Sequence, residues 1–308
     1  MKPEERRALY AILEAPLMTE GAVHEISWIL DHIKSLSLND YGQMLEKVHD
    51  IIERKKRKEP LQYILGEWSF RGYDFKVGPG VLIPRPETEE LVESVIMSLE
   101  NSNKSSALIL NKGFRVADLG AGSGCIGLSF VADLLKDVET ETSSAEEISK
   151  HISLTLVEKS PEAIKYLKEN LTRMRPHLLN TQVEVVDNDW INWDPKNKFN
   201  LFISNPPYLN SDEYRNIDSS VRDFEPKSAL IPERFNENDV FATQAYREIL
   251  EVAEKHLLPE AWIFMELSPL QADWIQSYAS DRESFNDLRT LKDMSKKPRI
   301  FCAKRKGE

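Results

Sequence analysis

The segment Ser204-Asn205-Pro206-Pro207-Tyr208 combines residues that could capture a single amino group. Two consecutive prolines carry no backbone N–H and hold the chain in a fixed extended path. The Pro206 carbonyl and the Asn205 side-chain oxygen can then converge on one –NH₂ group, which has two donors. Tyr208 would pack against a planar group and align it. This arrangement suits an amide or amino nitrogen aimed at an electrophile, and it requires no strong general base.

A glycine-rich segment is the second site candidate, with the sequence Asp118-Leu119-Gly120-Ala121-Gly122-Ser123-Gly124. Glycines let the backbone turn tightly and approach a ligand, and the helix expected next offers unpaired N–H groups. Alternating glycines exceed what a structural turn needs, so the loop indicates a cofactor site. Residues 122–127 also fit the pattern G-x-G-x-x-G, which leaves a dinucleotide open beside S-adenosylmethionine.

Acidic and aromatic residues nearby bear on the choice of cofactor. Glu158 ends the next expected strand, where its carboxylate could accept hydrogen bonds from the ribose hydroxyls of either cofactor. An acid at Asp118 opposes a pyrophosphate and favours the cationic methionine end of S-adenosylmethionine. Asp189 and Trp190 fit an adenine site, as a carboxylate near the exocyclic amine and an aromatic wall. A surface acid and a core tryptophan are the structural alternative for that pair.

For these candidate residues to meet in one site, the strands that carry them must end at the same edge of a sheet. From Phe114 onward apolar runs alternate with helical patterns, which is typical of a parallel sheet covered on both faces. Strands are expected at residues 114–119, 153–157, 182–186, 199–204, 262–267, 287–292 and 299–304. The intervening stretch 137–150 is rich in Glu, Thr and Ser, so we expect a surface insertion without chemistry.

The first part of the chain has a different pattern. Residues 1–60 show the apolar spacing of amphipathic helices, which predicts a small helical domain that docks a substrate. Its last helix ends in the cationic run 54–58, read as a solvated helix end or as a patch for a partner or RNA. Glycines and aromatic residues over 61–83 predict a β-hairpin linker. The catalytic domain is then expected over 84–308, with a helix starting at Thr88 or at Pro86.

Composition limits the function classes. A chain of 308 residues with 41% hydrophobic residues can bury a core, which excludes wholesale disorder. The net charge of −11 argues against a broad basic face for duplex DNA. Its two cysteines, Cys125 and Cys302, support neither a disulfide framework nor a zinc site, and no metal is expected. No apolar run approaches the roughly 18–20 residues that span a bilayer.

With both motifs placed, the chain resembles the HemK-type release factor glutamine methyltransferases from about Pro60 to the C-terminus. The family-specific parts are residues 62–68, 70–72, 82–89 and 224–230. The stretch 137–150 is longer than the compact bacterial pattern, and the last strand keeps only part of the family's Gly-x-x-Arg-Val ending. Both departures affect the periphery more than the chemistry.

The resemblance implies an α/β, Rossmann-like class I S-adenosylmethionine-dependent methyltransferase, with a seven-stranded, mostly parallel sheet, an N-terminal helical domain and a linking β-hairpin. It implies N5-methylation of the glutamine in the Gly-Gly-Gln tip of a peptide chain release factor. The residues expected at the cofactor are Asp118, Gly120, Ala121, Gly122, Ser123, Gly124, Glu158, Asp189, Trp190 and Asn205. Those expected at the amide are Phe70, Arg85, Glu87, Thr88, Asn205, Pro206, Pro207 and Tyr208. Arg85 could otherwise be a structural ion-pair former.

Three alternatives accompany this interpretation. An N6-adenine DNA methyltransferase could use the same acceptors, although base flipping usually calls for a basic groove. Another protein glutamine could be the substrate. A non-catalytic binding module should show damage in the glycine loop or in residues 205–208, and none is visible.

The partner expected is the Gly-Gly-Gln domain of a release factor, bound by a monomer without DNA or membrane contact. The wording of residues 62–68 looks like eukaryotic organellar members, which favours the mitochondrial matrix. Two early glutamates suit an organelle presequence badly, so the cytoplasm is the alternative.

Overall fold

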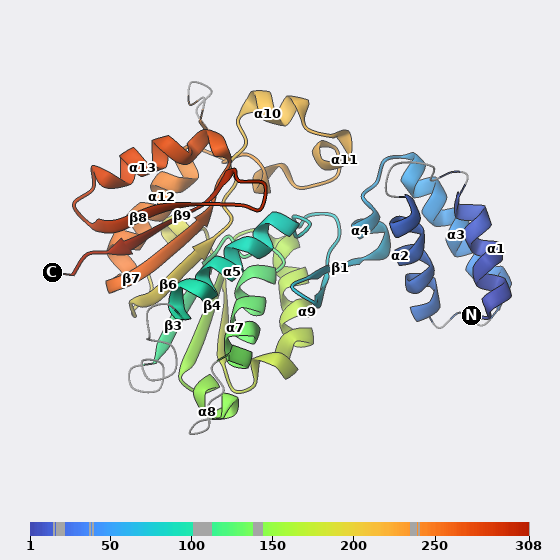
Figure 1. Ribbon diagram of the computed structural model, residues 1–308, viewed down its shortest axis with the longest axis horizontal. Coiled ribbons are helices and arrows are strands. Elements are labelled where there is room, and N and C mark those ends of the chain that lie inside the picture. Colours follow the sequence, from blue (N-terminus) through green and yellow to red (C-terminus); the bar gives the residue numbers. More distant parts are fainter. Residues whose placement is uncertain are drawn as a thin grey trace.

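The computed structural model describes residues 1–14, 16, 22–36, 38, 40–100, 113–137, 144–234, 239 and 241–307. Its larger part is a seven-stranded sheet between layers of helices (Figure 1). The strand order is β5-β4-β3-β6-β7-β9-β8, and β9 runs antiparallel to both of its neighbours. The strands are β3 Phe114–Leu119, β4 Ile152–Glu158, β5 Gln182–Asp187, β6 Phe199–Ser204, β7 Leu257–Glu266, β8 Phe285–Lys292 and β9 Pro298–Arg305.

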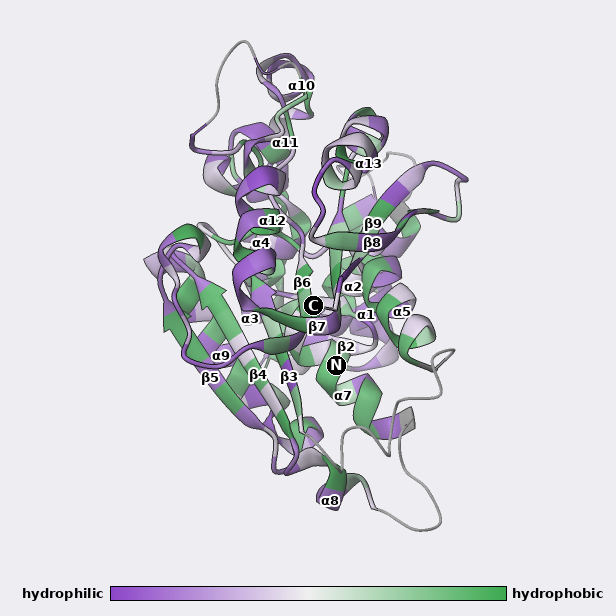
Figure 2. Ribbon diagram, turned by 90° about the vertical axis from the view of Figure 1, so that its left-hand side faces the viewer, coloured by the Kyte–Doolittle hydropathy of each residue, from purple (hydrophilic) through white to green (hydrophobic). Residues whose placement is uncertain are grey.

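The central strands are apolar because helices cover both of their faces. Along β3 and β6 every residue but the second is buried, whereas β5 at the sheet edge has no fully buried residue. Figure 2 shows the same contrast, with hydrophobic colour along much of β3 and β4 and a mixture of hydrophobic and hydrophilic colour along β5. The predicted mostly parallel sheet is confirmed, and β7 begins at Leu257, earlier than residue 262.

Two helical layers pack on the sheet. One core joins it to α5 Pro86–Glu100, α7 Cys125–Asp137 and α9 Pro161–Leu178. A second core on the opposite face joins it to α12 Gln244–His256 and α13 Ala272–Ser280. The short elements are α8 Ala145–Ser149, α10 Ser211–Asn216, α11 Ser219–Arg222 and the 3₁₀ turns η1 Trp190–Asn192, η2 Lys227–Ala229 and η3 Pro269–Gln271. None of the described helices is both long and apolar enough to cross a bilayer.

The N-terminal helices form a unit with its own core at one end of the molecule (Figure 1). Its helices are α1 Pro3–Glu14, α2 Ala22–Ser35, α3 Tyr41–Lys56 and α4 Leu61–Leu65. Asp40 caps α3 by accepting a hydrogen bond from the Gln43 N–H at 2.9 Å, and basic residues fill its last turn.

The expected hairpin over 61–83 is only partly present. The antiparallel strands β1 Glu67–Phe70 and β2 Tyr73–Lys76 form it, but the first residues of that range form α4. Leu61, Ile64 and Leu65 have helical spacing and are buried in the N-terminal core, and this spacing outweighed the glycine and aromatic content. Gly66 then ends α4 in the left-handed conformation.

Two other expectations on boundaries need adjustment. Helix α5 begins at Pro86 instead of using Thr88 as its cap, because proline suits the first helical position. The stretch 137–150 is not wholly a surface insertion. Its part 138–143 lies outside the described residues, but Ser144 caps α8, and Ile148 of that helix is fully buried in the main core.

Candidate active site

The site candidates gather where the carboxyl ends of three parallel strands meet. Strand β3 pairs with β4 on one side and with β6 on the other. The chain runs outward from β3 to β4 and β5 and then returns to β6, so the strand order reverses between β3 and β6. Such a switch point opens a crevice at the carboxyl ends of the strands, which is where α/β sheets bind ligands.

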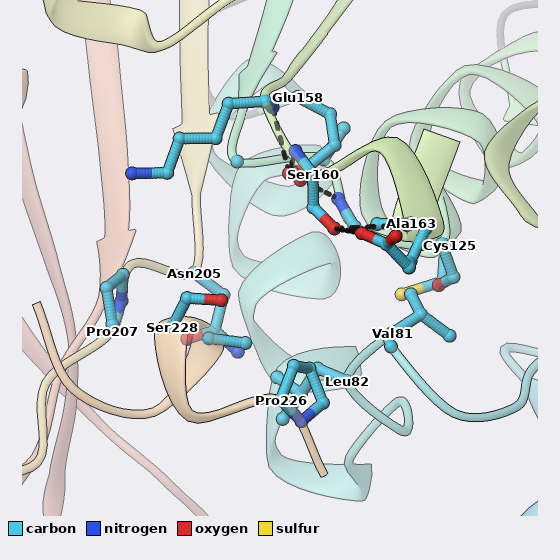
Figure 3. Close-up of a pocket in the computed structure, with 18 of the residues that line it drawn as sticks. Val81, Leu82, Cys125, Glu158, Ser160, Ala163, Asn205, Pro207, Pro226 and Ser228 are labelled. Carbon is cyan, nitrogen blue, oxygen red and sulfur yellow. Dashed lines mark hydrogen bonds between the residues drawn. The ribbon is translucent and has the colours of Figure 1, made fainter. Parts of the chain in front are cut away.

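A cavity of about 360 Å³ lies at this point (Figure 3). Its volume falls within the range of small-molecule sites. Figure 3 shows Glu158 and Ser160 on one side and Asn205, Pro207 and Ser228 on another. The residues that line it include Val81, Arg85, Thr88, Gly120, Ala121, Gly122, Ser123, Cys125, Glu158, Asn188, Trp190, Asn205 and Pro207.

The glycine loop needs glycine for its shape and for its openness. Gly120, Gly122 and Gly124 all have positive φ, at 76°, 56° and 80°. A Cβ on Gly124 would lie 2.4 Å from Leu167 Cδ1, so no side chain fits there. At Gly122 the nearest atom to such a Cβ is Val81 Cγ2 at 4.0 Å. Gly122 therefore leaves open the space that a ligand would take.

Glu158 ties the end of β4 to the glycine loop. Its Oε2 accepts a hydrogen bond from the Gly122 N–H at 2.8 Å, and its Oε1 accepts from Lys159 N–H at 2.9 Å and Ser160 N–H at 2.8 Å. The carboxylate also lines the cavity. It therefore fixes the loop and presents oxygen to a ligand at the position where ribose recognition was expected.

Asp118 lies beneath the loop instead of in the cavity wall. It is fully buried, and its Oδ2 accepts a hydrogen bond from Gly127 N–H at 2.9 Å. Its Oδ1 has no hydrogen-bond partner among the described residues, and burial raises the pKa of the carboxyl to about 7. The expected direct contact with a cofactor's methionine is not supported by this placement, because helix α7 and the loop lie over the side chain. Asp118 instead positions the start of α7.

The pair expected at an adenine is divided between two roles. Trp190 lines the cavity, and its Nε1 donates to Glu248 Oε2 at 3.0 Å, which fixes the indole plane. The Asp189 carboxylate forms ion pairs with Arg234 at 3.2 Å and Lys159 at 3.4 Å and is not part of the lining. Asn188 takes the place in the lining that Asp189 was expected to fill. Sequence reasoning missed Asn188, although it directly follows β5.

The structure separates the residues of the Asn-Pro-Pro-Tyr segment. Asn205 and Pro207 line the cavity, whereas Pro206 is buried and outside the lining. The Asn205 Nδ2 donates to Thr88 Oγ1 at 3.1 Å, which leaves its Oδ1 for another donor. The Tyr208 hydroxyl lies 3.4 Å from Glu266 Oε1, and this ring packs against the second core. Tyr208 is not in the lining, so its expected stacking on a planar group is not seen here.

The structure places the remaining residues that were expected at the substrate in different surroundings. Arg85 lines the cavity and pairs with the buried Glu225 at 2.5 Å, which is the structural ion pair held as its alternative. Phe70 is 1% exposed and packs edge-on against Phe75 in the main core, so it does not close the cavity as expected. Glu87 is exposed and lies in an outer groove away from the cavity. Both misplacements concern residues before or at the start of α5, whose side-chain directions the sequence does not show.

Glu266 is a site residue that sequence reasoning missed. It ends β7, is 1% exposed, and accepts a hydrogen bond from the Thr88 hydroxyl at 2.6 Å. Burial raises the pKa of its carboxyl to about 7. The signal was available, because an acid ending the apolar run of residues 261–265 is costly unless it serves a partner.

The sheet order, with β9 reversed, and the glycine loop at the end of its first strand define a class I S-adenosylmethionine-dependent methyltransferase. Residues 102–221 match the family model described as Methyltransferase small domain. The chain is 34% identical over 262 residues to the release factor glutamine methyltransferase of Thermodesulfovibrio yellowstonii, covering 84% of this chain and 81% of that protein. It therefore belongs to the family of release factor glutamine methyltransferases.

Other relatives are similar over most of their length. The Lactococcus lactis release factor glutamine methyltransferase is 32% identical, with 97% of each chain covered. The human protein named MTRF1L release factor glutamine methyltransferase is 28% identical, covering 86% of this chain and 73% of that one. The N-terminal helical unit therefore has a counterpart in the bacterial relative that aligns over almost its whole length.

Proposed function

We propose that this chain transfers a methyl group from S-adenosylmethionine to the side-chain amide nitrogen of the glutamine in the Gly-Gly-Gln tip of a peptide chain release factor. The observation that carries the proposal is the place of Asn205. Its side chain lines the same cavity as Gly122 and Glu158, and its Nδ2 is engaged by Thr88. Its Oδ1 is therefore the end that faces an incoming amide.

The cavity fits S-adenosylmethionine by the chemistry of its walls. Gly122 leaves space for the ligand, Glu158 presents a carboxylate where ribose hydroxyls can donate, and Trp190 supplies an aromatic wall. Asn188 adds a polar side chain beside that wall. We propose these residues, with the backbone of the glycine loop, as the cofactor contacts. Asp118 and Asp189 would act indirectly, through the start of α7 and the Arg234 ion pair.

S-adenosylmethionine, when bound, supplies an electrophilic methyl group on a sulfonium. The residues of this chain have to make a weak nucleophile usable, because the amide lone pair is delocalised into its carbonyl. Asn205 Oδ1 would accept one N–H of the substrate and hold the nitrogen in place. The Pro206 ring is buried outside the lining, but its backbone carbonyl lies in the chain between the lining residues Asn205 and Pro207, and we propose it as the acceptor of the other N–H. As the nitrogen gains positive charge, these acceptors stabilise it, and the proton is then lost to water.

The direct test is methyl transfer in vitro. The purified chain is incubated with methyl-labelled S-adenosylmethionine and candidate release factors, and mass spectrometry locates the label. We expect one methyl on the tip glutamine, and none when that glutamine is replaced by alanine. Label on a duplex DNA adenine, or on a glutamine outside the tip, would replace the proposal with one of the alternatives.

We further propose that the N-terminal helical unit docks the release factor, and that the enzyme acts as a monomer in the mitochondrial matrix. The support for the compartment is the likeness of residues 62–68 to organellar members, and the cytoplasm is the alternative. Fractionation of cells that produce the tagged protein would decide between the two compartments. Sedimentation of the protein alone and with a release factor would test the monomer.

A further inference from the structure

Two buried side chains are linked to Asn205 by hydrogen bonds, and one of them, Thr88, also lines the cavity. Thr88 comes from the first turn of α5 and is 2% exposed, and Glu266 ends β7 and is 1% exposed. The Thr88 hydroxyl joins them, since it lies 2.6 Å from Glu266 Oε2 and 3.1 Å from Asn205 Nδ2. The three groups form one chain of hydrogen bonds from a carboxylate to the wall of the site.

The direction of these hydrogen bonds is set by what each group can do. A carboxylate only accepts, so the Thr88 hydroxyl must give its single proton to Glu266. Having given that proton, the hydroxyl presents only lone pairs to Asn205. The amide of Asn205 can then face Thr88 only with its NH₂ end, and its oxygen must point the other way, toward the substrate position.

Without the carboxylate this order would be lost. A hydroxyl with a free proton can donate it to the Asn205 oxygen, and the amide can then turn by half a rotation. The cavity would receive an NH₂ group where an acceptor is needed, and a substrate –NH₂ would meet a donor instead of an acceptor. We propose that Glu266 is a positioning residue that, through Thr88, fixes the Asn205 amide with its oxygen toward the substrate nitrogen.

The surroundings of Glu266 make this control depend on pH. Arg299 on β9 favours its ionised form, whereas burial and Glu87 on α5 oppose ionisation. Tyr208 lies 3.4 Å from its Oε1, and the Tyr246 hydroxyl of α12 donates to its backbone carbonyl at 3.2 Å. Because burial is the largest effect and raises the pKa to about 7, a neutral carboxyl is accessible near neutrality. A neutral carboxyl can itself donate to Thr88 and release the hydroxyl proton toward Asn205.

The inference rests on the proposed function, so the wild-type enzyme must first methylate a Gly-Gly-Gln peptide. Thr88→Val keeps the shape of the side chain and removes the hydroxyl, and Thr88→Ser keeps the hydroxyl. Ser98→Ala is the matched control, because it removes a hydroxyl from the same helix whose hydrogen bond, among the described residues, is to the Ser94 carbonyl of that helix. For each variant, kcat and KM for the peptide are measured from pH 5.5 to 9, and cofactor affinity is measured by calorimetry.

For Thr88→Val we expect kcat to fall about tenfold or more, since a misplaced group of about 1 Å can cost on the order of a hundredfold. Cofactor affinity should stay within about twofold, because the change concerns the acceptor and not the cofactor. Thr88→Ser should restore most of the lost kcat. In the wild type, kcat should rise with pH through about 7, and Glu266→Gln should lower kcat and remove that rise.

Two results would overturn the inference while leaving the proposed function intact. One is equal kcat for Thr88→Val and Thr88→Ser. The other is a Glu266→Gln enzyme that keeps the wild-type rise near pH 7. If Thr88→Val does not fold, as circular dichroism would show, the pH profile of the near-isosteric Glu266→Gln decides the question alone. Failure of the wild type to methylate the peptide would instead reject the proposed function.

Discussion

Gly122 lines the cavity, and because glycine has no side chain, the space beside it is open to a ligand. Valine at this position would be strained by the φ of 56° and would project into the cavity toward Val81. We expect Gly122→Val to weaken S-adenosylmethionine binding at least about tenfold, which corresponds to roughly 1.4 kcal/mol. Isothermal calorimetry measures this change.

Gly72→Val is the matched control for that experiment. Gly72 likewise has a positive φ, at 76°, but nothing lies within 4 Å of an added Cβ there, and the residue is outside the cavity. Both variants should therefore lose stability, and only Gly122→Val should lose cofactor affinity. Equal affinities for the two variants would place the cofactor elsewhere.

Asp118 gives a prediction about stability and pH. Burial raises the pKa of its carboxyl to about 7, above the usual 3.8. In the folded chain this group therefore holds a proton at pH values where the unfolded chain has lost it. Its contribution to stability is full below pH 3.8 and is lost as the pH rises through about 7. Asp118→Asn removes this dependence and can still accept from the Gly127 N–H.

The free energy of unfolding of both proteins, measured by denaturant at pH 5 and pH 8, checks this reasoning. Relative to the wild type, the free energy of unfolding of Asp118→Asn should therefore be higher at pH 8 than at pH 5. A substitution effect of the same size at both pH values would contradict the assignment of a raised pKa to Asp118.

Among single residues, the sequence predicts best those whose function depends on the residues adjacent to them in the chain. The glycine loop and Asn205 were predicted because each motif is contiguous and its chemistry depends on local backbone. That Asp118, Asp189 and Phe70 do not line the cavity could not be predicted, since that depends on side-chain direction. Glu266 was missed for a related reason, because its partner Thr88 is 178 residues away.

A partly buried cluster of charged and polar side chains joins the hairpin of β1 and β2 to helix α7. Arg71 Nε donates to Asp133 Oδ2 of α7 at 2.6 Å, and the Tyr73 hydroxyl donates to Asp133 Oδ1 at 2.9 Å. Arg71→Met would remove this hydrogen-bonded ion pair and leave Asp133 with the more exposed Lys136, at 3.2 Å, as its cation. We expect a loss of about 2 kcal/mol in the free energy of unfolding, because a hydrogen bond to a charged group contributes roughly 1.5–3 kcal/mol.

Arg173→Met tests whether burial causes this effect. Arg173 pairs with Glu67 of the same hairpin at 3.2 Å, and both side chains are more than a third exposed. Its loss should cost less than about 1 kcal/mol. Similar denaturation midpoints for the two variants would mean that the Arg71 pair does not hold the hairpin.

Elements were predicted best where one periodicity dominates. The strands of the sheet are long apolar runs between helical patterns, so their order along the chain was clear. Helix α4 was missed because it is short and borders glycine-rich strands, and its apolar residues serve the N-terminal core. The role of α8 was missed because Ile148 is a single core residue within a polar stretch.

For the whole molecule, the docking proposal makes a prediction about substrate size. Trp28 on α2 is 45% exposed, contacts Trp68 of the hairpin edge-on, and borders a groove that reaches Arg85 at the cavity. Trp28→Ser should raise KM for an intact release factor about tenfold or more, because exposed tryptophans are frequent binding anchors. KM for a tip peptide should not change.

Val23→Ser is the control for this prediction. Val23 lies on the same helix and is 65% exposed, but it does not line the groove. It should leave both KM values unchanged. If Trp28→Ser affects the peptide and the intact release factor equally, the helical unit contributes to the site and not to docking. The relative placement of this unit and the groove could not be predicted from the sequence, because it depends on packing across the hairpin.

The hydrogen bond between Thr88 and Glu266 also bears on how a growing polypeptide becomes an enzyme during its synthesis. The glycine loop and its anchor Glu158 are both complete once β4 has left the ribosome, and they can assemble around β3. Asn205 follows only with β6, and its orientation waits for the end of β7. All side chains proposed to contact the methyl donor therefore leave the ribosome before Asn205, whereas Glu248 and Glu266, which fix Trp190 and Asn205, leave it later.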